Sequence, residues 1–307
     1  MHALGVYSAS TPYLVLTPAA PRLLQPITSA QIAQMAVASL YGELVLHPKP
    51  GLVTPFSNGS HSDMTAHTFM RSLFTLRHYF KEVSQAGRDG NEFDRLRQLG
   101  INAEQRMLRA TAGVNTHRGA IFSVGLLCAA IGATDLPHNA NAAHDADMIR
   151  RTLLRHWGEA LRGHTRGLGA DSHGAQARSR YGVEGAREQA AAGFPAVFDN
   201  GLPQLRATLA TGRDWTCACL DTLFVLMADL HDTNVVHRGG VAGTALVRRR
   251  AREFMSAGGT ANLDWRAHAT GIGQEFERHN LSPGGAADLL AATCLVYRAT
   301  ISTDVAN

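Results

Sequence analysis

The sequence lacks any hydrophobic run of the roughly 18 to 20 residues that a membrane-spanning helix needs. Its first 27 residues contain only His2 and Arg22 as possible cations and are interrupted by four prolines. A secretory signal needs a charged start followed by an apolar stretch, so this segment does not fit one. We therefore expect a loosely ordered arm over residues 1–27 and a cytoplasmic protein.

Cysteine is also scarce, with four in 307 residues. Cys217 and Cys219 are two positions apart, a spacing that suits neither a zinc knuckle nor a Cys-x-x-Cys redox pair. All four cysteines, including Cys128 and Cys294, lie in apolar helical patterns. This favours buried free thiols and a reducing compartment.

Lysine occurs only at Lys49 and Lys81, so nearly all of the 29 basic side chains are arginines, and the net charge is +4. Arginine presents a planar fork of donors that matches phosphate oxygens, so the excess would suit an anionic ligand. A genome that encodes arginine wherever lysine would serve explains the total equally well. The location of particular arginines is therefore more informative than their number.

The period-2 alternation of half-buried strands is almost absent, while apolar residues recur every three or four positions from residue 28 onward. These stripes predict helices over 28–46, 63–83, 91–112, 117–131, 140–163, 214–230, 241–256, 265–280 and from 282. The expected N-caps are Ser62, Asp214 and Ser282, with Pro283 at the first position of the last helix. We predict one all-α domain over residues 28–307, with about nine or ten helices, and a long polar loop at 163–185.

Glycine-bearing polar clusters stand beside several of these helix ends, at residues 47–53, 113–119, 232–240 and 280–285. A helix N-terminus attracts phosphate through its unpaired amides and the positive end of its dipole. Glycine lets the backbone approach the oxygens closely, and Arg118 and Arg238 add charged donors beside such starts. Together they would suit a nucleoside triphosphate, although the Walker loop and the Rossmann fingerprint are both missing.

Each cluster also has a purely structural interpretation. Glycine before a helix is ordinary punctuation, and Lys49, between two prolines, would be inert as an exposed loop lysine. His117 at a helix start is more often a hydrogen-bonding residue than a catalyst. The arginines at 248, 249, 250 and 252 suggest a nucleic-acid patch, but on a helix they spread over more than one face, which favours a solvated surface.

Carboxylates beside the clusters are candidate magnesium ligands, because a triphosphate usually arrives with Mg²⁺. This ion takes one or two protein carboxylates and keeps water and phosphate oxygens as its other ligands. Asp232 follows an apolar helix, and Asp288 lies one turn inside a glycine-rich helix start. Asp63 is a further candidate, although it would also stabilise the N-terminus of its own helix. Glu43 is expected to face the Lys49 loop.

At these clusters the sequence resembles the triphosphoribosyl-dephospho-coenzyme A synthase family. The resemblance is carried in order by Pro48-Lys49-Pro50-Gly51-Leu52-Val53, Gly113-Val114-Asn115-Thr116-His117, Asp232-Thr233-Asn234 with Arg238-Gly239-Gly240, and Ser282-Pro283-Gly284-Gly285 with Ala287-Asp288-Leu289-Leu290. It spans about residues 30 to 300. Each motif alone is weak, whereas the ordered set is specific.

The resemblance implies a reaction. The ribose 2′-hydroxyl of 3′-dephospho-CoA attacks the anomeric carbon of ATP's ribose, and adenine leaves. The product is the prosthetic-group precursor for the acyl carrier subunit of malonate decarboxylase or citrate lyase, and a carrier-protein transferase receives it. Nucleic acid and membrane are not expected partners.

One segment departs from the citrate lyase branch. That branch has Arg-Gly-Glu-Ala before a Gly-Phe/Tyr-Pro motif, whereas this chain has Arg187-Glu188-Gln189-Ala190 before Gly193-Phe194-Pro195. The usual acid is replaced by Gln189, with a carboxylate one residue earlier. Together with His237 before Arg238, this favours the malonate decarboxylase branch.

Displacing adenine requires holding the triphosphate, deprotonating the attacking hydroxyl and helping adenine depart through an oxocarbenium-like state. We expect His117 or Asp232 as the base. We expect Lys49, Arg118 and Arg238 to bind phosphate, and Asn115 and Asn234 to form hydrogen bonds to sugar or base. Arg187 is expected to contact the coenzyme's pyrophosphate, and Asp232, Asp288 and Asp63 to bind Mg²⁺. The backbone is expected to face the ligand at Gly239, Gly240, Ser282, Gly284 and Gly285.

Two other functions fit parts of the pattern. A helical, Mg²⁺-dependent hydrolase of ADP-ribose-like linkages would use the same carboxylates, with water as the acceptor. A non-enzymatic, arginine-rich helical protein would bind RNA with a steep salt dependence. The second gives no reason for Asp232 and Asp288 to lie beside glycine-rich turns.

Overall fold

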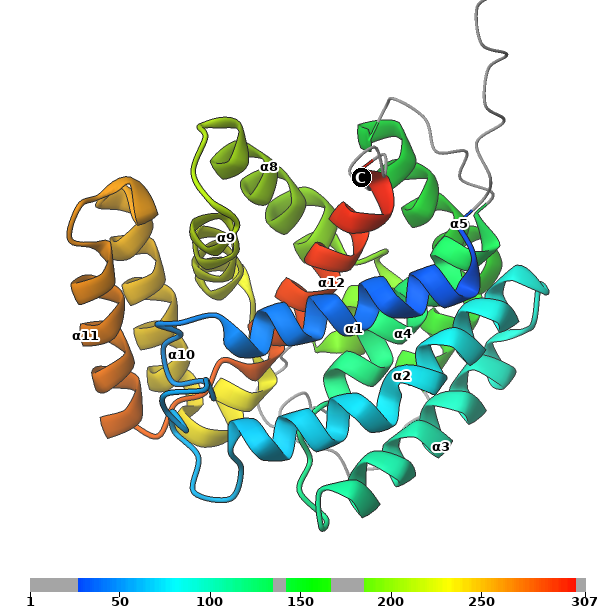
Figure 1. Cartoon of the computed structure of the whole chain (residues 1–307), viewed down its shortest axis with the longest axis horizontal. Helices are drawn as coiled ribbons and strands as arrows, with labels where there is room; N and C mark the ends of the chain where they lie inside the picture. Colours follow the sequence, from blue (N-terminus) through cyan, green and yellow to red (C-terminus); the bar gives the residue numbers. More distant parts are fainter. Residues whose placement is uncertain (1–26, 135–141, 167–184, 302–307) are drawn as a thin grey trace, which may run out of the picture.

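The computed structural model describes residues 27–134, 142–166 and 185–301, and within these ranges all regular structure is helical. This confirms the all-α prediction, and Figure 1 shows the arrangement. The α-helices are α1 (Ser29–Val45), α2 (Ala66–Arg88), α3 (Phe93–Ala110), α4 (Arg118–Ala133), α5 (Ala142–Arg166), α7 (Ala186–Ala191), α8 (Leu202–Ala210), α9 (Trp215–Asp229), α10 (Thr233–Ser256), α11 (Trp265–Arg278) and α12 (Gly284–Thr300). A π-helix, η1 (Ala196–Gly201), and a 3₁₀ turn, η2 (Gly259–Ala261), complete the list.

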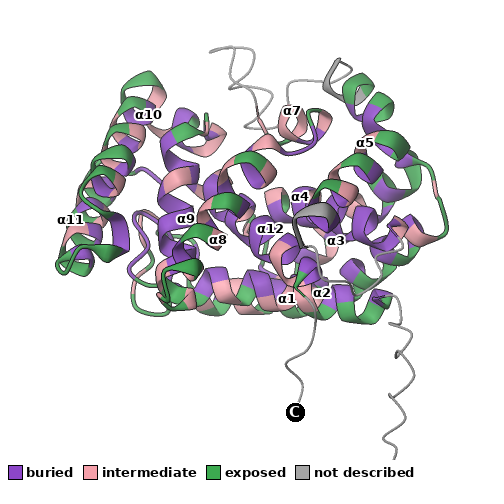
Figure 2. Ribbon diagram, turned by 90° about the horizontal axis from the view of Figure 1, so that it is seen from above, coloured by how far each residue is buried: buried purple, intermediate pink, exposed green. Residues whose placement is uncertain are grey.

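Helices α4 and α12 form the centre of the molecule. Both are apolar on nearly every face, and they pack against each other while α1, α2, α5 and α9 surround them. Figure 2 shows buried residues concentrated on these two helices and exposed residues on the outer faces of the others. A helix that is hydrophobic all round belongs in a core, so the sequence itself assigns this place.

Helix α4 lies unusually close to α2. A Cβ atom at Gly87 of α2, or at Gly125 or Gly132 of α4, would overlap atoms of the facing helix. The hydroxyl of Tyr79 donates to the carbonyl oxygen of Ile121 at 2.8 Å across this interface. The close contact fixes the direction in which the N-terminus of α4 points.

The predicted N-cap of α9 is confirmed, and two others are wrong. Asp214 accepts the backbone N–H of Cys217 at 2.7 Å. Ser62 does not cap α2, because Thr65 forms a capping box with Thr68 and starts the helix there. Ser282 and Pro283 do not act as cap and first residue, since Pro283 occupies the N-cap position of α12.

The segment between 186 and 210 contains helices that the periodicity did not predict, namely α7, η1 and α8. Helix α10 begins at Thr233 instead of 241, with a kink at Gly240, whose φ is 57° and ψ is −152°. The predicted arm at 1–27 lies, apart from Ile27, outside the described residues. The predicted polar loop at 163–185 starts too early, because α5 continues to Arg166, and its residues 167–184 lie outside the described residues.

All four cysteines are free, as predicted, although Cys217 is only partly buried. The sulfur atoms of Cys219 and Cys294 are 3.8 Å apart in the core. None of the described helices is long and apolar enough to cross a membrane.

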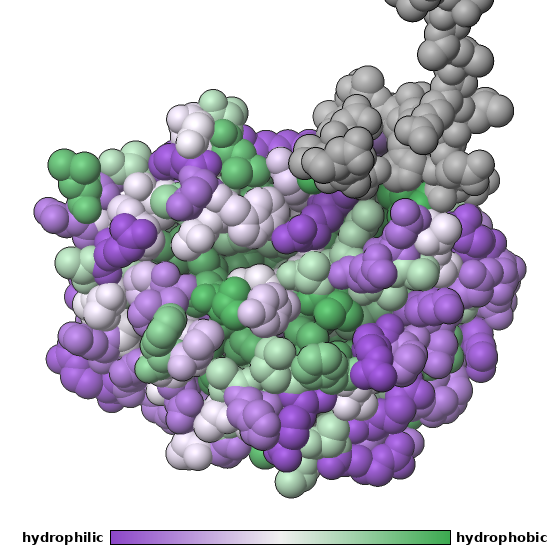
Figure 3. Space-filling view, in the orientation of Figure 1, coloured by the Kyte–Doolittle hydropathy of each residue, from purple (hydrophilic) through white to green (hydrophobic). Residues whose placement is uncertain are grey.

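One face of the molecule is crossed by α1, and hydrophobic side chains gather along it (Figure 3). Helix α1 contains a single charged residue, Glu43, and that residue is buried. Tyr41 and Val45 are among its exposed side chains. The exposed surface of α1 therefore carries no charged side chain.

Candidate active site

The structure contains a cavity of about 1560 Å³ between the starts of α4, α10 and α12 and the inner faces of α2 and α3. Every sequence-predicted site residue lines it except two. Those that do are Lys49, Asp63, Asn115, His117, Arg118, Arg187, Asp232, Asn234, Arg238, Ser282, Gly284, Gly285 and Asp288. Residues from clusters far apart in the sequence thus line the same cavity.

Gly239 and Gly240 do not line the cavity. A Cβ at Gly239 would overlap the side chain of Leu281, so this glycine allows α10 to pack against the loop before α12. Gly240 has the positive φ of the kink in α10, a conformation that glycine adopts without strain. The structure shows a packing role for Gly239 and a bending role for Gly240, and their predicted backbone contact with a ligand stays a prediction.

Asp232 joins two helix starts. Its Oδ1 accepts the backbone N–H of Asn234 in α10 at 2.9 Å, and its Oδ2 accepts that of Ala286 in α12 at 3.0 Å. Asp232 is only 4% exposed, and burial raises its pKa, although the backbone donors oppose this shift. A Cβ at Gly285 would lie 3.0 Å from Oδ2, so glycine there admits the carboxylate.

Asp288 reaches from α12 to the start of α4. Its carboxylate accepts the backbone N–H of Ala120, and a Cβ at Gly119 would overlap it. Burial, followed by the negative charges of Glu43 and Asp232, holds the pKa of Asp288 well above its usual range. A cation bound beside these carboxylates would reverse that shift, because it stabilises the charged form.

Lys49 is buried, with 6% of its surface exposed, and is not the solvated loop lysine of the structural interpretation. Its ammonium donates to the backbone carbonyl of Glu43 at 2.8 Å and forms an ion pair with the Glu43 carboxylate. Burial lowers the pKa of Lys49, and the Glu43 charge partly restores it. The predicted contact between Glu43 and the Lys49 loop is confirmed.

His117 is 2% exposed and stands at the N-cap position of α4. Its Nδ1 lies 2.6 Å from the hydroxyl of Ser72, and within the described ranges its Nε2 has no hydrogen-bond partner. Burial, with a smaller contribution from Lys49, lowers its pKa to about 3, so the ring is neutral at pH 7. The hydroxyl of neighbouring Thr116 is also buried without a partner in this part of the chain.

Arg238 is half-buried and connects two loops. One guanidinium nitrogen donates to the carbonyl oxygen of Ser60 at 2.8 Å and to Oδ1 of Asn280 at 2.9 Å. The other lies 3.1 Å from Nδ1 of His61, whose Nε2 lies 2.8 Å from the hydroxyl of Ser282.

The remaining predicted residues lie along the same cavity. Asn115 accepts the backbone N–H of Arg118 at 3.1 Å, so its side-chain oxygen caps α4. The guanidinium of Arg118 pairs with Glu104 of α3 and is half exposed. Asn234 packs against Gly284, and Arg187 of α7 lines the wall beside Glu188 and Gln189.

Gln189 has a structural contact at the position where the resemblance places an acid. Its side-chain oxygen accepts the backbone N–H of Ala196 at 3.1 Å, at the start of η1. The carboxylate of Glu188 accepts the backbone N–H of Gly185 at 2.9 Å. Glu188 therefore stabilises the start of α7, and Gln189 connects α7 to the start of η1.

Among the described residues, no three His, Cys, Asp or Glu side chains converge as metal ligands. Magnesium brought by a triphosphate needs fewer, and Asp232 lies near enough for its charge to raise the pKa of Asp288. Asp63 is not part of this pair: its side chain is 60% exposed, and its Oδ1 lies 3.7 Å from Nδ1 of His61. The chemistry of the donor set therefore fits Mg²⁺ at Asp232 and Asp288.

The sequence pattern did not single out several residues of the cavity. His61 is one of them, and it belongs to the cavity because loops and helix starts far apart in the chain meet there. Thr116 and Gly119 also line the cavity; the predicted cluster at 113–119 contains them but gave them no role of their own. A second group forms an apolar wall from α3 and α4, made of Phe93, Leu96, Ile101, Phe122 and Leu126. Their helical periodicity could have been found in the sequence, but it does not distinguish a cavity wall from a core.

Comparison with known proteins gives a consistent result. A family model described as ATP:dephospho-CoA triphosphoribosyl transferase matches residues 29–303. The chain is 40% identical to a probable 2-(5″-triphosphoribosyl)-3′-dephosphocoenzyme-A synthase of Acinetobacter calcoaceticus, over 86% of this chain and 89% of that protein. It is 42% identical to proteins of the same name from Stutzerimonas stutzeri, over 90% and 93%, and from Pseudomonas putida, over 87% and 94%. No solved structure matches the chain significantly.

Proposed function

Since this chain belongs to the ATP:dephospho-CoA triphosphoribosyl transferase family, we propose that its cavity transfers the triphosphoribosyl group of ATP to the 2′-hydroxyl of 3′-dephospho-CoA. The products are adenine and 2′-(5″-triphosphoribosyl)-3′-dephospho-CoA. One observation carries the proposal: a single cavity collects nearly all the residues that the sequence assigns to this chemistry.

The reaction exchanges one bond at the anomeric carbon of ATP. The 2′-oxygen of the acceptor bonds to C1′, and the bond from C1′ to N9 of adenine breaks. The electron pair leaves with adenine, which is then protonated, and the hydroxyl proton passes to a base on the enzyme. Positive charge develops on the ribose between these events, as in glycoside hydrolysis.

The triphosphate is best accommodated where the starts of α10 and α12 meet. Asn234, Ser282 and the backbone of Gly284 line this end of the cavity, and Lys49, Arg118 and Arg238 contribute positive charge. Asp232 and Asp288 would hold Mg²⁺, which offsets the phosphate charge when bound. Asp63 stays outside this arrangement, because its carboxylate is largely exposed.

We favour His117 over Asp232 as the base. His117 lines the cavity and its buried Nε2 is unpartnered in the described chain, whereas both oxygens of Asp232 already accept backbone N–H groups. A ring with a pKa of about 3 is a weak base in the empty protein. The negative charges of a bound triphosphate favour the protonated ring and raise that pKa.

The acceptor, dephospho-CoA, fits the apolar wall that α3 and α4 contribute to the cavity. Phe93, Leu96, Ile101, Phe122 and Leu126 offer apolar surface for the pantetheine arm of dephospho-CoA. Arg187 lines the same cavity, and its guanidinium would contact the pyrophosphate of dephospho-CoA. The two substrates then meet at the starts of α4 and α12, where His117 and Asp288 lie.

Adenine release tests the proposal. ATP is incubated with the enzyme in magnesium buffer, with and without dephospho-CoA, and the products are separated by chromatography. We expect adenine only in the presence of the acceptor, together with a heavier coenzyme product. Adenine released without acceptor would identify the hydrolase instead, and no adenine in either mixture would refute the transferase.

We also propose that the product serves malonate decarboxylase. The support is the run Arg187-Glu188-Gln189-Ala190 and His237 before Arg238. Deleting the gene in its host should leave the malonate decarboxylase carrier subunit without its prosthetic group, measured as a loss of mass. An unmodified citrate lyase carrier subunit in the deletion strain, with malonate decarboxylase intact, would assign the other pathway.

A further inference from the structure

The hydrogen-bond chain from Arg238 through His61 to Ser282 has a defined direction. A guanidinium nitrogen can only donate, so the Nδ1 of His61, 3.1 Å from Arg238, accepts and carries no proton. A neutral ring then has its proton on Nε2, which donates to the hydroxyl of Ser282 at 2.8 Å.

The charges around His61 agree with this tautomer. Burial and the charge of Arg238 lower the pKa of His61, which favours the neutral ring at pH 7. The carboxylate of Asp63 acts in the other direction, but its Oδ1 is 3.7 Å from Nδ1, beyond hydrogen-bond distance, and faces solvent.

The direction of the chain determines what Ser282 offers to a ligand. Its oxygen accepts from His61, so its own proton is free to be donated. Within the described part of the chain His61 is the only hydrogen-bond partner of this side chain, which is 3% exposed and lines the cavity. Gly284 and Gly285 line the cavity beside it. A buried donor in that position matches a ligand atom that only accepts, such as an anionic phosphate oxygen.

We propose that His61 is a positioning residue that acts through Ser282: held by Arg238 with its proton on Nε2, it orients the Ser282 hydroxyl to donate to the triphosphate. The identity of this ligand rests on the proposed function. No motif of the sequence assigned a role to His61, because its partners Ser282 and Arg238 are separated from it by more than a hundred residues.

Binding of inorganic tripolyphosphate tests the proposal without the chemical step. Calorimetric titration compares the full-length wild type with Ser282→Ala, His61→Ala and the double variant. Each single change should weaken binding about tenfold, as expected for one hydrogen bond to a charged group. The double variant should bind no more weakly than Ser282→Ala, because both changes remove the same interaction. Losses that multiply, or no loss at all, would overturn the proposal.

His61→Gln separates orientation from mere support of the fold. The glutamine oxygen can accept from Arg238 while its N–H donates to Ser282, so the side chain reproduces the direction of the imidazole. We expect this variant to recover most of the affinity that His61→Ala loses, and thermal unfolding to show all variants folded. A folded His61→Gln as weak as His61→Ala would refute the directional role.

Steady-state kinetics distinguish this proposal from the proposed function. The KM for ATP should rise in Ser282→Ala and His61→Ala with little change in kcat, because a contact present throughout the reaction is lost. If tripolyphosphate binding follows the predicted pattern but no adenine is released, His61 still positions Ser282 and the transferase is wrong. If adenine is released and all variants bind tripolyphosphate equally, the transferase stands and the role of His61 is wrong.

Discussion

His117 is the residue whose replacement should affect turnover most directly. In His117→Asn the amide can keep the contact with Ser72, but no group replaces Nε2. Loss of a positioned base typically costs about 10²- to 10⁴-fold in rate, so we expect kcat to fall by at least about 100-fold. Adenine release measures the change, and wild-type turnover in both this variant and Asp232→Asn would refute the assignment of the base.

The same substitution should change the pH dependence of stability. Burial lowers the pKa of His117 to about 3, below the 6.5 of an exposed histidine, so between these values the unfolded chain binds more protons than the folded one. The wild type therefore loses stability as the pH falls from 6.5 toward 3. His117→Asn should show a shallower loss in denaturant titrations across that range. An identical slope would show that the ring is not buried in its neutral form.

Two glycines offer a matched comparison. Gly119 of α4 faces the carboxylate of Asp288, whereas a Cβ at Gly271 of α11 meets no atom within 4 Å. Gly271→Ala should raise stability by about 0.5 to 1 kcal/mol, because alanine restricts the unfolded chain. Gly119→Ala should lower stability and adenine release together, since Asp288 must move. Equal melting temperatures for the two variants would contradict this contact.

At the residue scale the sequence predicted contacts that are local and missed those that are not. Lys49 and Glu43 are six residues apart, so spacing alone placed them together. His61 and Ser282 are 221 residues apart, and they meet because their two loops pack together, where the hydroxyl of Ser60 donates to the carbonyl oxygen of Leu281 at 2.6 Å. The polar motif residues could be selected from their chemistry, whereas the packing of Gly239 against Leu281 could not, because a packing glycine and a ligand-facing glycine look alike in sequence.

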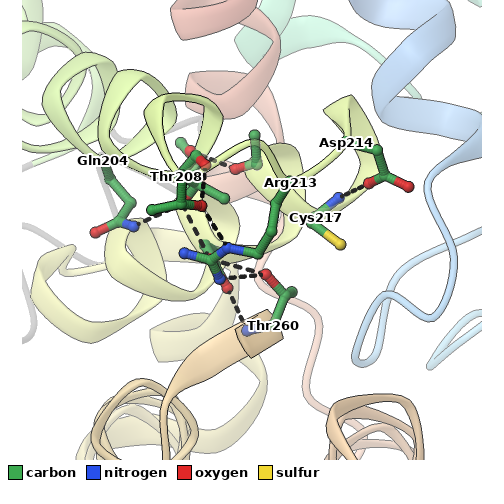
Figure 4. Close-up of polar contacts among 10 residues, drawn as sticks. Gln204, Thr208, Arg213, Asp214, Cys217 and Thr260 are labelled. Carbon is green, nitrogen blue, oxygen red and sulfur yellow. Dashed lines mark hydrogen bonds and ion pairs between the residues drawn. The ribbon is translucent and has the colours of Figure 1, made fainter. Parts of the chain in front are cut away.

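At the scale of elements, α8, α9 and η2 are held together by a buried polar network (Figure 4). Asp221 of α9 is almost fully buried and pairs with Arg213 at 3.0 Å. It also accepts the backbone N–H of Thr260 at 2.8 Å and the hydroxyl of Thr208 at 3.0 Å. Removing the carboxylate leaves several donors without an acceptor.

Asp221→Ala should therefore destabilise the protein by about 3 kcal/mol or more, as when one partner of a buried ion pair is lost. Asp214→Ala, which removes only the N-cap of α9, should cost about 1 kcal/mol. Neither residue lines the cavity, so the turnover of the folded fraction should match the wild type. Denaturant unfolding measures the difference, and equal losses would show that the network is not cooperative.

Helix boundaries show where sequence periodicity is sufficient. Long amphipathic stripes such as α2 and α3 were predicted within a few residues. Helix α8 spans nine residues and has no capping side chain, and η1 is a π-helix, so neither carries the signal of a regular stripe. Helix α2 begins at Ala66, three residues after the predicted start, because Thr65 and Thr68 form a reciprocal capping box, which caps the helix better than the single serine at 62.

At the scale of the whole molecule, the cavity joins helix starts from early, middle and late parts of the chain. A ligand bound there stabilises the folded state over the unfolded one, by about 2.7 kcal/mol at 100 times its Kd. For a protein of this size that corresponds to roughly 4 °C in Tm. We expect tripolyphosphate and ATP to raise Tm by this amount and adenine alone to raise it less, measured by thermal unfolding. An equal or larger shift with adenine would place the dominant contacts on the base.

The double attachment of Asp232 has a thermodynamic consequence. One carboxylate holds the first turns of α10 and α12, so a ligand that displaces either turn alters the free energy of the other. Such coupling is reciprocal: whatever factor one occupant adds to the affinity of the second, the second returns to the first. The two hydrogen bonds of Asp232 therefore provide a direct link through which binding at one helix start would alter affinity at the other.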